Sequence, residues 1–195
     1  MGTRGFVGVY VDGQTKGIYN HFDSYLQGLG LSTATDISLI AEKYPNINFE
    51  EKARDWIAVD EDTKPTKEQI KEYKKHSDLS VSSRSYEDWY CLLRNLQGEI
   101  VQHLAEVRHY FDSKNFLDDS LFCEWAYIWN LDDNLFEVYK GFQKRRHRKG
   151  RYAKNKPNEN GYYPVALIHR FDINEHLVSN FNKYVERYKK KLQES

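Results

Sequence analysis

Hydrophobic and polar positions alternate with a period of two in several stretches of the chain, as they do in strands that bury one face. Residues 5–22 contain two such runs around Asp12-Gly13, a dipeptide that accepts the positive φ angles of a hairpin turn. Residues 122–142 contain two more, separated by turn-forming residues at 132–134. A last run covers 162–169. The pattern therefore predicts an N-terminal hairpin and three further strands late in the chain.

Helical signals fill the middle of the chain. The stretch 24–44 is typical of one or two short helices, and 56–59 of a short strand. Thr66 and Gln69 stand at the spacing of a capping box, in which each side chain bonds the other residue's main-chain N–H. That spacing predicts a helix over about 67–76.

The 3.6-residue period is clearest in two longer segments. Apolar residues recur at helical spacing over 86–110, which predicts one long helix. Gly98 inside it indicates either close backbone packing or a break between two helices. A second apolar stripe covers 177–188 and predicts a C-terminal helix. Asp172 and Glu175 have the spacing of a capping box for this helix.

This order of elements is typical of an α+β fold, because strands cluster at both ends of the chain with helices between and after them. We expect a largely antiparallel sheet, made of the N-terminal hairpin and the 122–171 strands, packed against the 86–110 and C-terminal helices. A length of 195 residues fits a single domain, 1–195, with a flexible basic loop at 143–161.

Composition excludes several classes of protein. The chain has 29 basic and 29 acidic residues, so its zero net charge gives no global argument for a nucleic acid or membrane partner. No apolar run approaches the roughly 18 to 20 residues of a membrane span, and the first residues lack a signal-peptide pattern, so we expect a cytoplasmic protein. Cys91 and Cys123 predict two buried thiols. His103 and His109 are six apart, so they lack the spacing of a metal pair, and without a nucleotide-binding motif we expect neither metal nor cofactor.

The densest polar cluster is residues 19–25, YNHFDSY, where the first hairpin ends and a helix begins. Strand ends allow side chains to project without disturbing the core. Together with an arginine near the chain start, these side chains form our candidate ligand-binding set: Arg4, Tyr19, Asn20, His21, Asp23 and Tyr25.

The same cluster also permits a catalytic interpretation. His21 beside Asp23 offers a base and the group that orients it, and Thr3 or Ser24 would supply the attacking hydroxyl. A purely structural role, as a strand-end hydrogen bond and a helix cap, fits the same residues.

Several motifs resemble those of an uncharacterised family of small proteins from bacteria and their phages. The chain opens with MGTRGF, continues with YNHFDSY and GLG, and later carries WYCLLR, QG and EWAY, so the resemblance covers most of its length. It implies no established activity, although a phage origin favours a host-directed or counter-defence role.

A second resemblance is to N-terminal-nucleophile hydrolases of the bile-salt and penicillin acylase type, which begin Met-Cys-Thr and carry Arg-Asn-x-Asp after one hairpin. Here Gly2 stands in place of the nucleophilic cysteine, and no arginine precedes Asn20. The resemblance therefore implies a sheet of that kind without its chemistry. The rigid donor fork of the Arg4 guanidinium would suit a carboxylate or phosphate ligand, and an ordinary surface arginine flanked by glycine fits the same position.

A basic segment lies between Lys140 and Lys156, with nine Lys or Arg residues and no acidic residue. Flanking tyrosines and arginines suit a phosphate backbone with stacked bases. A solvated loop or a contact with an acidic protein surface fits the same charges. The candidate nucleic-acid or partner-binding residues are Lys144, Arg145, Arg146, Arg148, Lys149 and Arg151.

The sequence favours a non-enzymatic binding or inhibitory protein that recognises a host or phage macromolecule, or a small anionic ligand. The first alternative is a hydrolase or transferase that uses His21 and Asp23. The second is a nucleic-acid binder that relies on the basic segment alone.

Overall fold

The computed structural model describes residues 2–194, so Met1, the first residue of the opening motif, lies outside the described residues. Its strands are β1 (Gly5–Val11), β2 (Gln14–Asn20), β3 (Ile57–Val59), β4 (His109–Phe111), β5 (Trp125–Asn130), β6 (Leu135–Lys140) and β7 (Ala166–Asp172). Its helices are the π-helix η1 (Leu26–Gly30), α1 (Leu31–Ser38), α2 (Ile40–Lys43), α3 (Phe49–Arg54), α4 (Lys67–Tyr73), η2 (Lys74–His76), α5 (Trp89–Leu92), η3 (Arg94–Leu96), α6 (Ile100–Glu106), η4 (Lys114–Asp118), η5 (Arg151–Lys154) and α7 (Leu177–Gln193).

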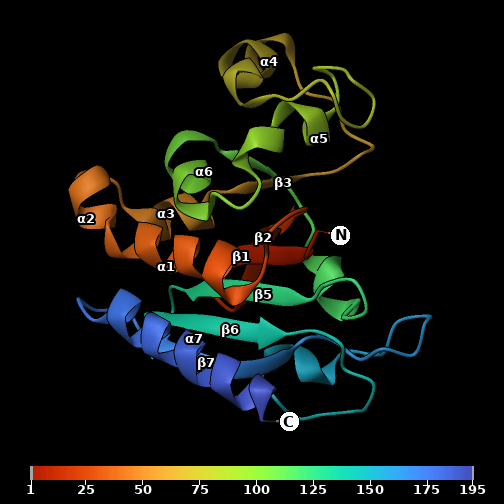
Figure 1. Cartoon of the computed structure of the whole chain (residues 1–195). Helices are drawn as coiled ribbons and strands as arrows, with labels where there is room; N and C mark the ends of the chain where they lie inside the picture. Colours follow the sequence, from red (N-terminus) through yellow and green to blue (C-terminus); the bar gives the residue numbers. More distant parts are fainter. Residues whose placement is uncertain (1, 195) are drawn as a thin grey trace.

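The predicted α+β fold is confirmed. Five strands form one mixed sheet in the order β2-β1-β5-β6-β7, in which only the β1–β5 pair is parallel (Figure 1). The two predicted hairpin turns lie at one end of this sheet, where the Asp132 carboxylate accepts hydrogen bonds from the main-chain N–H groups of Asp12 and Gly13, at 2.8 and 3.0 Å. The N-terminal hairpin and the later strands are thus tied together at their turns.

The sheet is covered on both faces. Helices α1 and α7 lie side by side over one face, with α3 and α6 beside them (Figure 1). Trp125 and Trp129 are buried on this face, where Trp125 packs on Tyr188 of α7 and Trp129 on Phe49 of α3. On the other face, Tyr152 of η5 packs among buried strand residues.

The predicted 86–110 helix is wrong, because this stretch divides into α5, η3, α6 and strand β4. Gly98 separates η3 from α6 with a φ of +86°, a left-handed conformation that a continuous α-helix excludes. β4 pairs in parallel with β3, the short strand expected at 56–59, to form a small second sheet. The apolar residues of this stretch are buried by several short elements in succession. One continuous helix would bury the same residues, so their spacing does not distinguish the two structures.

The last strand and the last helix also differ from prediction at their ends. Strand β7 covers Ala166–Asp172 instead of 162–169. The last helix begins at Leu177, and the expected Asp172–Glu175 capping box is absent because Asp172 is still part of β7. Asn174 accepts the main-chain N–H of His176 at 2.9 Å. The Thr66–Gln69 box is confirmed at the start of α4.

Candidate functional site

One end of the sheet gathers the polar residues singled out at the chain start. Gly5 at the start of β1 lies opposite Asn20 at the end of β2 and Trp125 at the start of β5. Residues 2–4 and 21–25 therefore leave the sheet side by side, and the main-chain N–H of Ser24 donates to the carbonyl of Thr3 at 3.1 Å. The predicted placement of Arg4 beside the 19–25 segment is thus found in the structure.

His21 is oriented by a tyrosine. The Tyr19 hydroxyl and His21 Nδ1 are 2.6 Å apart and share a hydrogen bond. Burial lowers the pKa of His21, so the imidazole is neutral at pH 7. Asp23, the expected partner, is exposed, has a φ of +51° and uses its carbonyl to accept the N–H of Leu29. Among the described residues no hydrogen bond or ion pair joins Asp23 to His21, so the geometry does not provide the expected base and orienter.

Ser24 and Asn20 support the turn between β2 and η1. The Ser24 side chain is completely buried, and its hydroxyl accepts a hydrogen bond from Asn20 Nδ2 at 2.9 Å. Asn20 also donates to the carbonyl of Phe22, and the Tyr127 hydroxyl donates to the carbonyl of Ser24 at 2.9 Å. These contacts enclose the hydroxyl that was a candidate nucleophile. The side chain of Tyr25 is exposed, and its main-chain carbonyl accepts the N–H groups of Gly28 and Gly30 within η1.

A residue that the sequence analysis did not select completes the site. Arg94 lies in η3, 90 positions from Arg4, and both guanidinium groups act on His21, where they add to burial in lowering its pKa. Burial raises the pKa of Tyr19, and the positive charges of Arg4 and Arg94 oppose this effect. We call Arg4, Tyr19, His21 and Arg94 the rim cluster.

Both arginines of the rim cluster lack an acidic partner within the described range 2–194. Arg4 stands over the Phe122 ring at 5.4 Å from its centroid, and Arg94 donates to Gln97 Oε1. Neither forms an ion pair with a described carboxylate, although Arg94 contributes at longer range to the lowered pKa of Asp78. Arg94 Nε is buried and finds no hydrogen-bond partner among these residues. Two positive charges that act on the same two side chains, with no acidic partner among the described residues, are suited to hold an anion.

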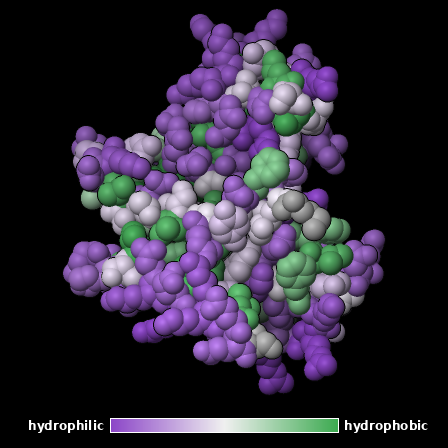
Figure 2. Space-filling view, in the orientation of Figure 1, coloured by the Kyte–Doolittle hydropathy of each residue, from purple (hydrophilic) through white to green (hydrophobic). Residues whose placement is uncertain are grey.

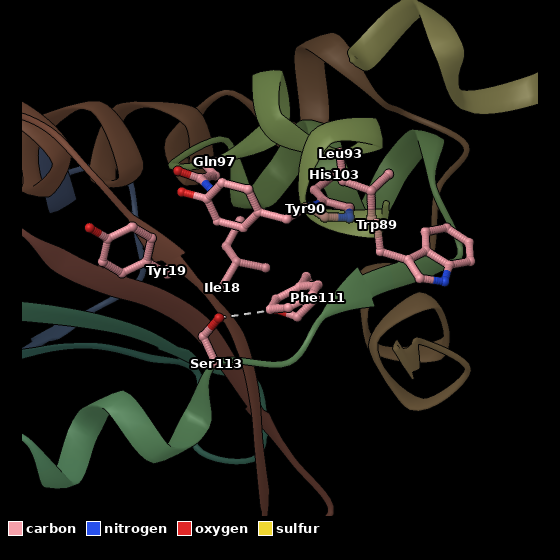
Figure 3. Close-up of a pocket in the computed structure, with 9 residues that line it drawn as sticks. All are labelled: Ile18, Tyr19, Trp89, Tyr90, Leu93, Gln97, His103, Phe111 and Ser113. Atoms are coloured by element: carbon pink, nitrogen blue, oxygen red, sulfur yellow. Dashed lines mark hydrogen bonds between the residues drawn. The ribbon is translucent and has the colours of Figure 1, made fainter. Parts of the chain in front are cut away.

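A small cavity lies next to the rim cluster, between β2 and the α5–η3 segment (Figure 3). Tyr19, Tyr90, Gln97 and His103 are among its lining residues, and its volume is about 20 Å³. That volume holds about one water molecule. A larger ligand therefore has to bind on the outer side of the rim cluster, where Arg4 is exposed.

The basic segment is held against the sheet at several points. The His147 ring bonds the carbonyl of Pro164 at 2.8 Å, and the Tyr152 hydroxyl bonds Thr15 at 2.8 Å. Arg151 faces inward, where its guanidinium donates to Glu137 at 2.8 Å. The other five predicted binding residues are exposed: Lys144, Arg145, Arg146, Arg148 and Lys149.

Within residues 2–194, no three His, Cys, Asp or Glu side chains gather as a metal site would require, and no helix is long and apolar enough to cross a membrane. Comparison with protein-family models, curated proteins and solved structures finds no match to this chain.

Proposed function

We propose that this protein is a binding protein that recognises an anionic group of its ligand through the rim cluster. The observation that carries the proposal is that the charges of Arg4 and Arg94 both act on Tyr19 and His21, while neither arginine has an acidic partner among the described residues. Guanidinium groups form charge-assisted hydrogen bonds with carboxylates, phosphates and sulfates. Exposed Phe22 and Phe122 stand beside His21 and Arg4 and offer apolar contact to the rest of the ligand.

The geometry supports binding better than the hydrolase alternative. The Ser24 hydroxyl is enclosed, and His21 pairs with Tyr19 instead of Asp23. A neutral imidazole on which two cations act can donate its ring N–H to an anion, or take up a proton from solvent when the anion binds, and both are recognition roles.

Replacing Arg94 by glutamine is expected to weaken binding of inorganic phosphate and pyrophosphate at least about tenfold, because a charged hydrogen bond contributes roughly 1.5 to 3 kcal/mol. Isothermal titration calorimetry at low salt measures this. The matched control is Arg108→Gln, which removes an exposed arginine located elsewhere, next to β4. Phosphate affinity that falls equally in both variants, or in neither, would contradict the proposal.

The affinity for sulfate is expected to rise as the pH falls from 7.5 to 5.5. The pKa of His21 lies below its usual 6.5, so the free ring is neutral at the upper pH. A bound anion favours the charged imidazolium, and linkage then requires tighter binding as the ring becomes protonated. Sulfate does not titrate in this range, so the proton uptake belongs to the protein. In His21→Gln the pH dependence should be flat; an unchanged rise would place the titrating group elsewhere.

A further inference from the structure

A second charged surface surrounds β7, the edge strand of the sheet. A groove of about 640 Å³ lies between β7 and α7. Its apolar and aromatic lining residues include Leu167, Ile168, Tyr184 and Tyr188. Three cations stand around them: Lys149, Arg187 and Lys191. The surface over α7 is mostly hydrophilic in Figure 2, as expected for a helix with this many charges.

A second groove adjoins the first on the other side of Lys149. Its volume is about 660 Å³, and its lining includes Arg146, Arg148 and Lys154. The main chain joins the two grooves, because the carbonyl of Lys149 accepts the N–H of Leu167 in β7 at 3.1 Å. A Cβ atom on the next residue, Gly150, would stand 2.7 Å from the Leu167 Cβ, so only glycine allows this close approach.

Positive charge in the two grooves is not neutralised locally. Among the residues that the structure describes, none that lines either groove is acidic. Within the described part of the chain, Arg151 and its partner Glu137 form the one ion pair that includes a lining residue of these grooves. We name the other exposed cations the basic band: Arg146, Arg148, Lys149, Lys154, Arg187 and Lys191. The segments 140–156 and 187–191 are far apart in sequence. Folding brings their charges together and produces a positive electrostatic potential that neither segment has alone.

Half-buried rings lie between these cations. Tyr184 stacks on His169 with 4.5 Å between ring centroids and 25° between planes, and Tyr188 lies 6.1 Å from Tyr184. Rings fixed by such packing lose little conformational freedom when a planar group stacks on them. Cations that follow a phosphate backbone, interleaved with rings, are the features that bind single-stranded nucleic acid without reading its sequence.

We propose that the basic band binds single-stranded nucleic acid, independently of the rim cluster. A single strand suits this surface better than a duplex because the band bends around the β7 edge, from α7 to the segment that contains η5. Phosphates contact the cations of both grooves, and bases stack on Tyr184 and Tyr188.

Fluorescence anisotropy with a labelled twelve-nucleotide oligo(dT) tests the proposal. The double variant Arg148→Ser/Arg187→Gln is expected to bind at least about tenfold more weakly at low salt. The slope of log K against log salt should also become shallower by about 1.4, since each lost phosphate contact on a single strand contributes roughly 0.7. The control Lys64→Gln/Lys75→Gln removes the same charge from lysines that are already paired with Glu87 and Glu106, and should leave binding unchanged.

A third variant separates nucleic acid from other polyanions. Tyr188→Leu keeps an apolar contact with Trp125 but removes a stacking surface, and should weaken oligo(dT) at least about fivefold while leaving inorganic polyphosphate unaffected. An equal loss of oligo(dT) affinity in Arg148→Ser/Arg187→Gln and in the control Lys64→Gln/Lys75→Gln would overturn the proposal. Polyglutamate binding as tightly as oligo(dT) would overturn it in favour of an acidic protein partner. If only Arg94→Gln lost oligo(dT) binding, the nucleic acid would bind at the rim cluster and the proposal would be wrong.

Discussion

Replacing Arg151 by methionine is expected to lower the free energy of unfolding by about 3 kcal/mol, because it leaves a buried carboxylate without its main counterion. Glu137 is completely buried in β6, and its carboxylate accepts hydrogen bonds from Arg151 at 2.8 Å and from the Tyr139 hydroxyl at 2.8 Å. The Arg151 guanidinium also stands 3.6 Å from the centroid of the Tyr10 ring. Urea unfolding followed by circular dichroism measures the loss.

Arg170 provides the matched control for this prediction. Its guanidinium also donates to Glu137, at 3.3 Å, but its side chain is half exposed, so Arg170→Met should cost less than about 1 kcal/mol. The double variant Arg151→Met/Glu137→Gln should recover part of the lost stability, because it removes the charge that the first substitution leaves buried. Equal losses in Arg151→Met and Arg170→Met would show that the buried pair does not hold the basic segment to the sheet.

This pair also explains why the sequence could not separate Arg151, which is tied to the sheet, from the candidate binding residues beside it. Among the cations of the basic segment, nothing local distinguishes Arg151 from Arg148. The relevant signal is Glu137, an acidic residue in the middle of a strand with buried neighbours on both sides. A carboxylate at such a position requires a partner, but the sequence does not reveal which of several nearby cations it is.

The strands of the sheet could be predicted because hydrophobic and polar residues alternate along a strand in the same way, whichever strands lie beside it. Val7, Val9 and Val11 face one side whatever strand lies beside β1, so the hairpin was found without knowledge of its parallel neighbour β5. Helices in the middle of the chain were harder to predict. Their burial spacing is the same whether the chain continues or breaks, and the break at Gly98 depends on a positive φ that tertiary contacts select.

The rim cluster was found in part for the same reason. Residues 19–25 follow a predictable strand, so their position at the end of the sheet could be inferred together with that of Arg4. The His21–Asp23 pairing failed because Asp23 adopts a positive φ and turns the chain toward η1. Arg94 was missed because its proximity to His21 is purely tertiary, and only the covering of the β2 side by α5 and η3 brings it there.

Acidification from pH 7 to pH 5 is expected to remove about 2 kcal/mol of stability through a single buried histidine. His103 in α6 is 1% exposed, and burial lowers its pKa from 6.5 to about 4. Its Nε2 lies 2.7 Å from the carbonyl oxygen of His109, which identifies Nε2 as the donor of a neutral ring. The unfolded chain binds a proton at this site below about 6.5, whereas the folded chain resists it until about 4. The contribution of His103 to the free energy of unfolding is therefore fully present above pH 6.5, and it is lost steadily as the pH falls from 6.5 to about 4.

The variant His103→Gln isolates this contribution. Glutamine retains a donor for the carbonyl of His109 but does not titrate, so the variant is less stable at neutral pH yet loses less stability on acidification. His76 and His109 also have pKa values lowered by burial, so the variant should keep a smaller acid sensitivity. Urea midpoints at pH 7, 6 and 5 for both proteins give the difference directly. An identical loss in His103→Gln and the parent chain would show that protonation of His103 does not limit the acid stability of this fold, and the water-sized cavity that it lines would then have to solvate the charged ring.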